Sequence, residues 1–169
     1  EGPVVAGENL LRLSLSRDEF AALLRPVHVA IAAELTGVAQ AVLDGAVNYA
    51  KTREQFGKPI GSFQAIKHKL ADVFVATTNA RQAVRHAAST DDASSVNAAR
   101  VLAADAALKA TADYVQIQGG MGISWESEAH LYLKRARRLT AAYGDTWKFR
   151  HAIADRFIAS VLDEATTGG

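Results

Sequence analysis

The sequence predicts an all-α protein, an up-and-down four-helix bundle with an extra short helix. Long alanine-rich stretches are dominated by good helix formers, and only three prolines interrupt them. Apolar residues recur at steps of three and four, the period of a helix that buries one face. The breaks between these stretches are short, as in bundles of antiparallel helices. With 49% apolar and 22% charged residues, the composition is that of a globular domain.

The first residues do not share this helical pattern. Residues 3–15 contain a Val-Val-Ala-Gly run that reads as a strand end or loop with little of its own to pair with. The chain also starts at Glu1 without an initiating methionine, which suggests a cut or processed product or, equally, a segment chosen for expression. We therefore expect residues 1–15 to be a linker or the remnant of a preceding domain, and residues 16–169 to form the helical bundle domain.

The first helical region should begin near Ser16. Ser16 and Glu19 have the spacing of a capping box, in which the hydroxyl and the carboxylate satisfy free backbone N–H groups. Pro26 is expected to kink or restart this helix, because proline removes a backbone donor. The pattern then continues to about Thr52, and the glycines and proline of residues 57–61 end it.

Four further helices are expected. One begins at Ser62 or Phe63 and ends before the polar residues 89–92; another runs from about Ser94 to Gln118, is rich in alanine, and ends at a glycine cluster. A short helix should cover about 127–142, and a last helix should follow Gly144-Asp145 and reach about Glu164. The apolar stripe of the second helix consists of Phe63, Ile66, Leu70, Val73, Thr77, Ala80 and Val84.

Charge and composition narrow the classes of function. The formal net charge is +1, which argues against a nucleic-acid or membrane-surface role. The five histidines lack metal-ligand spacing, so no metal site is expected. There are no cysteines, no apolar stretch of the roughly 20 residues needed for a membrane span, and no signal-peptide pattern at the start. A cytoplasmic location is therefore expected.

A first candidate binding segment connects the first two long helices. Arg53 follows a helix end, Phe56 precedes a glycine turn, and Gln64 opens the next helix. Arginine can clamp a phosphate, an aromatic ring can cover an adenine or ribose, and an amide can meet a polar ligand group. The alternative is an ordinary connection between two helices with a solvated arginine.

A second candidate segment is Tyr114–Ile123, which ends the alanine-rich helix with three glycines in four residues. Glycines let the backbone approach a ligand closely, and free N–H groups there suit a pyrophosphate. The alternative is a helix C-cap with glycines in left-handed conformation.

Together these segments resemble the C-terminal domain of the acyl-CoA dehydrogenase family. The resemblance runs from about Val27 to Arg150 and is carried by R-x-Q-F-G-K-P-I-x-x-F-Q-A-I and, some fifty residues later, Q-x-x-G-G-x-G. It implies that an N-terminal helical domain and a β domain normally precede this one. It also implies that FAD lies across a subunit interface, with its pyrophosphate and adenosine held by this domain of the neighbouring subunit. The residues that match the FAD contacts are Arg53, Phe56, Gln64, Gln116, Gly119 and Gly120.

The sequence departs from the family at the catalytic base. Most members place a glutamate after the short helix, and Tyr143 occupies that position here, where a phenol of pKa about 10 is a poor base. In other branches the glutamate lies on the first long helix, where the match gives Val27, beside His28. Glu19 and Glu34 are interpreted as surface or interhelical charges, and Asp145 as a cap of the last helix rather than a displaced base. No catalytic residue is therefore assigned.

The resemblance implies three alternatives for the function. The first is a non-catalytic subunit, as in actinobacterial heterotetrameric acyl-CoA dehydrogenases, that completes the FAD site of a glutamate-bearing partner. The second is a self-sufficient homo-oligomeric dehydrogenase that uses a displaced acid such as Asp145. The third is a helical interaction module without enzymatic activity. For the first two, the expected ligands and partners are FAD, acyl-CoA and an electron-transfer flavoprotein.

Overall fold

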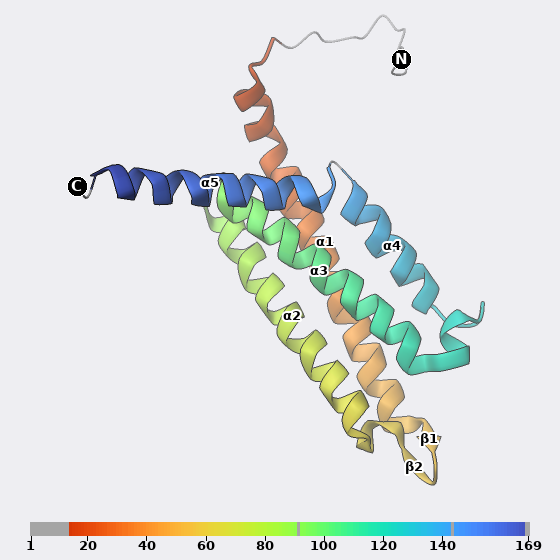
Figure 1. Cartoon of the computed structure of the whole chain (residues 1–169). Coiled ribbons are helices and arrows are strands. Elements are labelled where there is room, and N and C mark those ends of the chain that lie inside the picture. The colour runs from red at the N-terminus through yellow and green to blue at the C-terminus, as the bar shows by residue number, and fades with distance from the viewer. Residues whose placement is uncertain (1–13, 91, 143, 168–169) are drawn as a thin grey trace, which may run out of the picture.

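The computed structural model describes residues 14–90, 92–142 and 144–167. Figure 1 shows α1, α2, α3 and α4 running up and down beside one another, while α5 lies across one end of α3 and projects beyond the bundle. The all-α bundle predicted from the sequence is confirmed. In chain order the elements are α1 (Arg17–Thr52), β1 (Glu54–Gln55), β2 (Lys58–Pro59), the 3-10 helix η1 (Ile60–Ser62), α2 (Gln64–Ser89), α3 (Ala93–Gln118), the 3-10 helix η2 (Gly119–Ile123), α4 (Ala129–Ala141) and α5 (Thr146–Thr167).

Helix α1 begins with the predicted capping box. The Glu19 amide donates to the Ser16 hydroxyl, and the Glu19 carboxylate accepts from the Ser16 amide at 2.8 Å. The expected restart at Pro26 was wrong, because one helix continues through this residue to Thr52. Proline costs the helix one backbone hydrogen bond. The packing of Val27 and Val29 against the core on the next turn stabilises the helical path across that gap.

Helix α3 forms the centre of the bundle and contacts each of the four other helices. Its small side chains let the neighbouring backbones approach closely, as its alanine content predicted. The opposing faces of α1 and α4 contribute larger side chains, including Leu35, Val42 and Leu139, which fill the space above the alanines. The fully buried alanines of α3 are Ala99, Ala103, Ala104, Ala106, Ala107 and Ala110.

The predicted apolar stripe of α2 faces this core. Val73, Thr77 and Ala80 are buried, and Leu70 and Val84 are partly buried against the same cluster. The periodicity of the sequence therefore predicted correctly which face of α2 is buried.

The connection between α1 and α2 differs from the simple glycine turn that the sequence suggested. β1 and β2 pair as an antiparallel hairpin, with Glu54 opposite Pro59 and Gln55 opposite Lys58. The two residues of the turn, Phe56 and Gly57, both have positive φ angles, of 55° and 75°. This is the backbone geometry that favours tight two-residue hairpins. The hairpin places Phe56 in its turn, away from the core of the bundle.

By length and composition alone, α1 could cross a membrane, since it contains an 18-residue window of mean hydropathy 1.4. Of that window, 44% is buried within the bundle. Residues such as Leu35, Ala39 and Val42 pack against the neighbouring helices. Core packing is therefore sufficient to account for the apolar character of α1.

Candidate functional site

Arg53 lies where α1 ends and the hairpin begins. Its backbone N–H donates to the Tyr49 carbonyl at 2.8 Å, and its own carbonyl accepts from the Ile60 amide at 2.8 Å. These two bonds fix the backbone at Arg53, while its side chain is exposed. Within the described part of the chain the guanidinium has no hydrogen-bond or ion-pair partner, so its donors remain available to an anion.

Phe56 lies at the tip of the hairpin and is 92% exposed. A positive φ is unfavourable for a large side chain, so both its backbone and its exposure are costly. Its ring meets Phe63 edge to face, with centroids 6.2 Å apart, and the Lys58 ammonium lies 4.6 Å from the centroid of Phe63. Lys58 thus lies over the ring that Phe56 contacts, and Arg53 directly precedes the hairpin in the chain.

Gln64 is the first residue of α2, and its side chain is exposed. The helix start beneath it is anchored by a small apolar cluster made of Ala46, Ala50, Ile60 and Ile117, with Phe63 packed against it. This cluster joins the hairpin and the start of α2 to the last turn of α3.

The three glycines of the second candidate segment lie in different structural surroundings. Gly119 caps α3 with φ 61°, and its N–H donates to the carbonyls of Gln116 and Val115, which fits the alternative interpretation as a helix C-cap for this one glycine. Gly122 is buried, and a Cβ there would lie 2.5 Å from the Val115 carbonyl oxygen. At Gly120, by contrast, an added Cβ would meet nothing within 4 Å. Gly120 is exposed, and the packing of this chain therefore does not require a glycine at this position.

The two candidate segments meet at one end of the bundle (Figure 1). The Tyr49 hydroxyl, at the end of α1, lies 3.5 Å from the Gln118 carbonyl oxygen, and Ile117 belongs to the cluster under the hairpin. Tyr49 and Gln118, 69 positions apart in the sequence, thus lie side by side at this end of the bundle.

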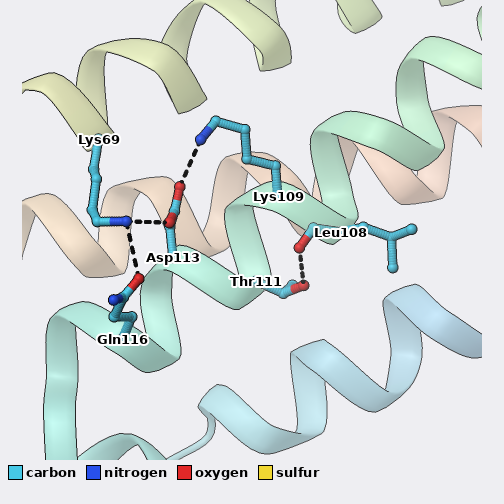
Figure 2. Close-up of polar contacts among 6 residues, drawn as sticks. All are labelled: Lys69, Leu108, Lys109, Thr111, Asp113 and Gln116. Carbon is cyan, nitrogen blue, oxygen red and sulfur yellow. Dashed lines mark hydrogen bonds and ion pairs between the residues drawn. The ribbon is translucent and has the colours of Figure 1, made fainter.

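Gln116 takes part in a polar network that joins α2 to α3. Lys69 donates from its ammonium to Asp113 Oδ1 and to Gln116 Oε1, each at 2.9 Å, and Lys109 donates to Asp113 Oδ2 at 2.9 Å (Figure 2). Burial raises the pKa of Asp113, but hydrogen bonds and charge from Lys109 and Lys69 outweigh it, so the pKa lies below its usual range. Asp113 is therefore a carboxylate shared by two ammonium groups.

The residues on either side of the position expected for the family base, Ala142 and Gly144, lie at the other end of α3. Tyr143 is outside the described residues. Asp145 is exposed, and its carboxylate accepts from the Thr146 hydroxyl at 3.3 Å, while the Lys148 amide donates to the Asp145 backbone carbonyl at 3.1 Å. The turn at the start of α5 is thus closed by the backbone of Asp145 rather than by the predicted side-chain cap.

The other acids considered as bases have structural partners. The Glu34 carboxylate accepts from Arg135 Nε at 2.6 Å and joins α1 to α4 on the surface. Glu19 belongs to the capping box, where its bonds to the Ser16 amide and hydroxyl lower its pKa. Both agree with the interpretation as surface charges. Arg150 donates to both oxygens of Asp105, at 2.6 and 2.7 Å.

Arg100 is a residue whose role sequence reasoning missed. Its side chain is fully buried, and its guanidinium donates to the carbonyls of Leu139 at 3.5 Å, Ala142 at 3.0 Å and Gly144 at 3.4 Å. The cation thereby satisfies carbonyls that the end of α4 leaves without helical partners. It thereby holds Ala142 and Gly144, the residues on either side of the expected base position.

His28 and Phe149 complete this end of the bundle. The guanidinium carbon of Arg100 lies 5.0 Å from the centroid of the Phe149 ring, which meets His28 edge to face at 5.1 Å. Burial, and then the charge of Arg100, lower the pKa of His28. Together these contacts join α1, α3 and α5 around the loop that follows α4.

Among the described residues, no group of three or more His, Cys, Asp and Glu side chains could hold a metal ion. The family model for the acyl-CoA dehydrogenase C-terminal domain matches residues 22–158. The chain belongs to the acyl-CoA dehydrogenase family of oxidoreductases. The match covers both candidate cofactor segments and the loop held by Arg100.

Several acyl-CoA dehydrogenases resemble the chain in sequence. It is 46% identical over 106 residues to acyl-CoA dehydrogenase IpdE2 of Mycolicibacterium smegmatis, covering 63% of this chain and 34% of that protein. It is also 46% identical over 126 residues to acyl-CoA dehydrogenase FadE34 of Mycobacterium tuberculosis, covering 70% of this chain and 18% of that protein. The chain thus spans about a third or less of the length of these relatives.

Solved structures of the family share the fold. Butyryl-CoA dehydrogenase of Megasphaera elsdenii superposes with a TM-score of 0.77 at 31% identity, over 82% of this chain and 38% of that one. A glutaryl-coenzyme A dehydrogenase bound to glutaryl-CoA superposes with a TM-score of 0.80 at 28% identity, over 84% of this chain and 38% of that one.

Proposed function

We propose that this chain acts as a supporting component of an FAD-dependent acyl-CoA dehydrogenase, and that it grips the pyrophosphate and adenosine of an FAD whose flavin lies in a neighbouring subunit. In this proposal the chain does not itself remove the α-proton of the acyl thioester. A glutamate-bearing partner subunit supplies that base, and the two subunits together oxidise the acyl-CoA.

The observation that carries the proposal is the shared surface at the hairpin end of the bundle. Arg53 has hydrogen-bond donors without partners among the described residues, and the aromatic ring of Phe56 is exposed. At Gly120 no atom of the chain lies within 4 Å of the place where a Cβ would be. Each is poorly explained by the folding of this chain alone, because Phe56 carries a backbone cost and Gly120 has room for a side chain. Binding of a ligand from outside the chain accounts for all three.

These residues suit FAD chemically. The Arg53 guanidinium can pair with a phosphate, Phe56 can cover the adenine or ribose, and the amides of Gln64 and Gln116 can hydrogen-bond polar groups. The backbone of Gly119 and Gly120 can approach the pyrophosphate without steric hindrance. When bound, FAD would supply the acceptor for the hydride from the β-carbon of the substrate.

The assignment of the base to a partner rests on the sequence around Tyr143 and on the surroundings of the acids that could replace a glutamate. Glu19 and Glu34 already serve the capping box and an ion pair, and Asp145 is exposed beside Thr146. On α3, Gln116 at the proposed FAD surface lies about 24 Å along the helix from Arg100, at a rise of ~1.5 Å per residue. This separation fits a domain that contributes to two different parts of an assembly.

The remaining expectations follow from this assignment. We propose a cytoplasmic assembly that takes acyl-CoA as substrate and passes electrons to an electron-transfer flavoprotein. The resemblance to mycobacterial acyl-CoA dehydrogenases agrees with a heteromeric enzyme of the actinobacterial type, acting in the breakdown of fatty acids or steroid side chains.

The test compares the FAD content and FAD dissociation constant of the assembly purified with this chain, before and after Arg53→Ala. Loss of an ionic hydrogen bond should weaken FAD by about 10- to 100-fold. Arg85→Ala is the matched control, because Arg85 is exposed on α2 away from the hairpin. Unchanged FAD binding by Arg53→Ala would contradict the proposal.

A further inference from the structure

Gln116 is held in one orientation by Lys69. The Lys69 ammonium carries only hydrogen-bond donors, so the group that faces it at 2.9 Å must be the side-chain carbonyl of Gln116. The amide NH2 of Gln116 therefore points away from Lys69. Gln116 is exposed and lies one turn before Gly119, the C-cap of α3.

Lys69 is in turn held by Asp113. The Asp113 side chain is only 12% exposed, and both of its oxygens are occupied, one by Lys69 and the other by Lys109 (Figure 2). A buried carboxylate between two ammonium groups has few alternative arrangements, so it restricts the position of the Lys69 head group. The order of contacts is thus Asp113 to Lys69 to Gln116, and it crosses from α3 to α2 and back.

We propose that Lys69, fixed by Asp113, is a positioning residue that turns the Gln116 amide outward as a hydrogen-bond donor to a phosphate oxygen of FAD. This inference rests on the proposed function, because it requires FAD at this surface. The oriented donor adds to the charge of Arg53 and selects an acceptor-rich ligand.

The two lysines on Asp113 provide a matched pair of variants. Lys69 and Lys109 both lie 2.9 Å from Asp113 and have similar exposure, 35% and 42%, but the Gln116 contact belongs to Lys69. In the flavin-bearing assembly, Lys69→Met should weaken FAD about tenfold, the effect of losing one oriented hydrogen bond. Lys109→Met should change the FAD dissociation constant less than about twofold, while both variants lower the thermal midpoint by similar amounts.

A second variant tests the direction of the amide. Gln116→Glu keeps an oxygen for Lys69 and the shape of the side chain, but it replaces the outward donor by an acceptor with negative charge. It should therefore fold as stably as the native protein and weaken FAD more than tenfold. In the Gln116→Ala background, Lys69→Met should have no additional effect on FAD, since Lys69 acts through Gln116.

The results separate this inference from the function on which it rests. A native assembly without FAD would overturn both. If the native assembly binds FAD but Lys69→Met and Lys109→Met weaken it equally, or if Gln116→Glu leaves the affinity unchanged, only the positioning role is overturned. Restoration of most of the affinity by Lys69→Arg, which keeps the charge and the donors, would support it.

Discussion

The Arg100 guanidinium donates a 3.0 Å hydrogen bond to the carbonyl oxygen of Ala142, the C-cap residue of α4. This contact joins the centre of the bundle to the loop where the family places its base. The charge is buried without a carboxylate partner among the residues described, and it is balanced by carbonyl dipoles and the face of Phe149. Such an arrangement fixes the loop whether or not the loop contains an acid.

Arg100→Met should destabilise the protein, because it leaves the carbonyls of Leu139, Ala142 and Gly144 without this donor. We expect the free energy of unfolding to fall by about 2 to 4 kcal/mol. Denaturant unfolding measures this loss, and hydrogen exchange should show faster exchange at the end of α4. An exchange increase confined to the hairpin end of the bundle would contradict the account.

Phe56→Asn should separate stability from cofactor binding. Asparagine tolerates a positive φ better than phenylalanine, which offsets the loss of the edge-to-face contact with Phe63, worth about 0.5 to 1.5 kcal/mol. The unfolding free energy should thus change by less than about 1 kcal/mol, while FAD binding weakens. Denaturant unfolding and a FAD titration on the same assembly test this, and unaltered FAD affinity would remove Phe56 from the site.

The neighbouring glycines should respond in opposite ways to alanine. Gly122→Ala places a Cβ 2.5 Å from the Val115 carbonyl, so backbone must move, at a cost of about 1 to 3 kcal/mol. Gly120→Ala meets no atom within 4 Å and should fold normally, but it should weaken FAD if the pyrophosphate approaches the backbone there. Thermal unfolding and FAD titration of both variants distinguish packing from binding. Normal FAD affinity in Gly120→Ala would count against the proposed contact.

The carboxyl group of Asp92 should make the free energy of unfolding depend on pH in the acidic range. As the N-cap of α3 it accepts from the amide and hydroxyl of Ser95, and these bonds, helped by Arg156, lower its pKa to about 2. Since the folded pKa is below the unfolded value of about 3.9, the contribution is complete above about pH 4 and is lost as the pH falls toward 2.

The carboxyl carbon resonance of Asp92 should titrate with a midpoint near 2. In Asp92→Asn, which can still cap the helix, stability should lose this part of its pH dependence. A midpoint near 4 would show that the cap does not form in solution.

Much of the fold could be predicted because its signals are local. The Ser16–Glu19 capping box and the stripe that includes Val73 and Thr77 are readable within a few residues, and the structure confirms both. The hairpin was missed because its strands contain two residues each and its turn places Phe56 where glycine or asparagine is usual.

The polar networks could not be predicted for a different reason. An arginine in an alanine-rich helix looks like a solvated charge, and the carbonyls that surround Arg100 come 39 to 44 residues later. Likewise, Lys69 and Asp113 are 44 positions apart and meet only when α2 packs against α3. The candidate cofactor residues were found because they resembled a family pattern, and the structure added the contacts that orient them.

We propose that this chain helps to hold FAD for a partner that supplies the base. Native mass spectrometry of the assembly purified with this chain, combined with its flavin content, tests the claim most directly. The account predicts bound FAD together with a second acyl-CoA dehydrogenase subunit that has a glutamate at the base position. An assembly of this chain alone that reduces its own flavin with acyl-CoA, or an assembly that holds no FAD, would contradict it.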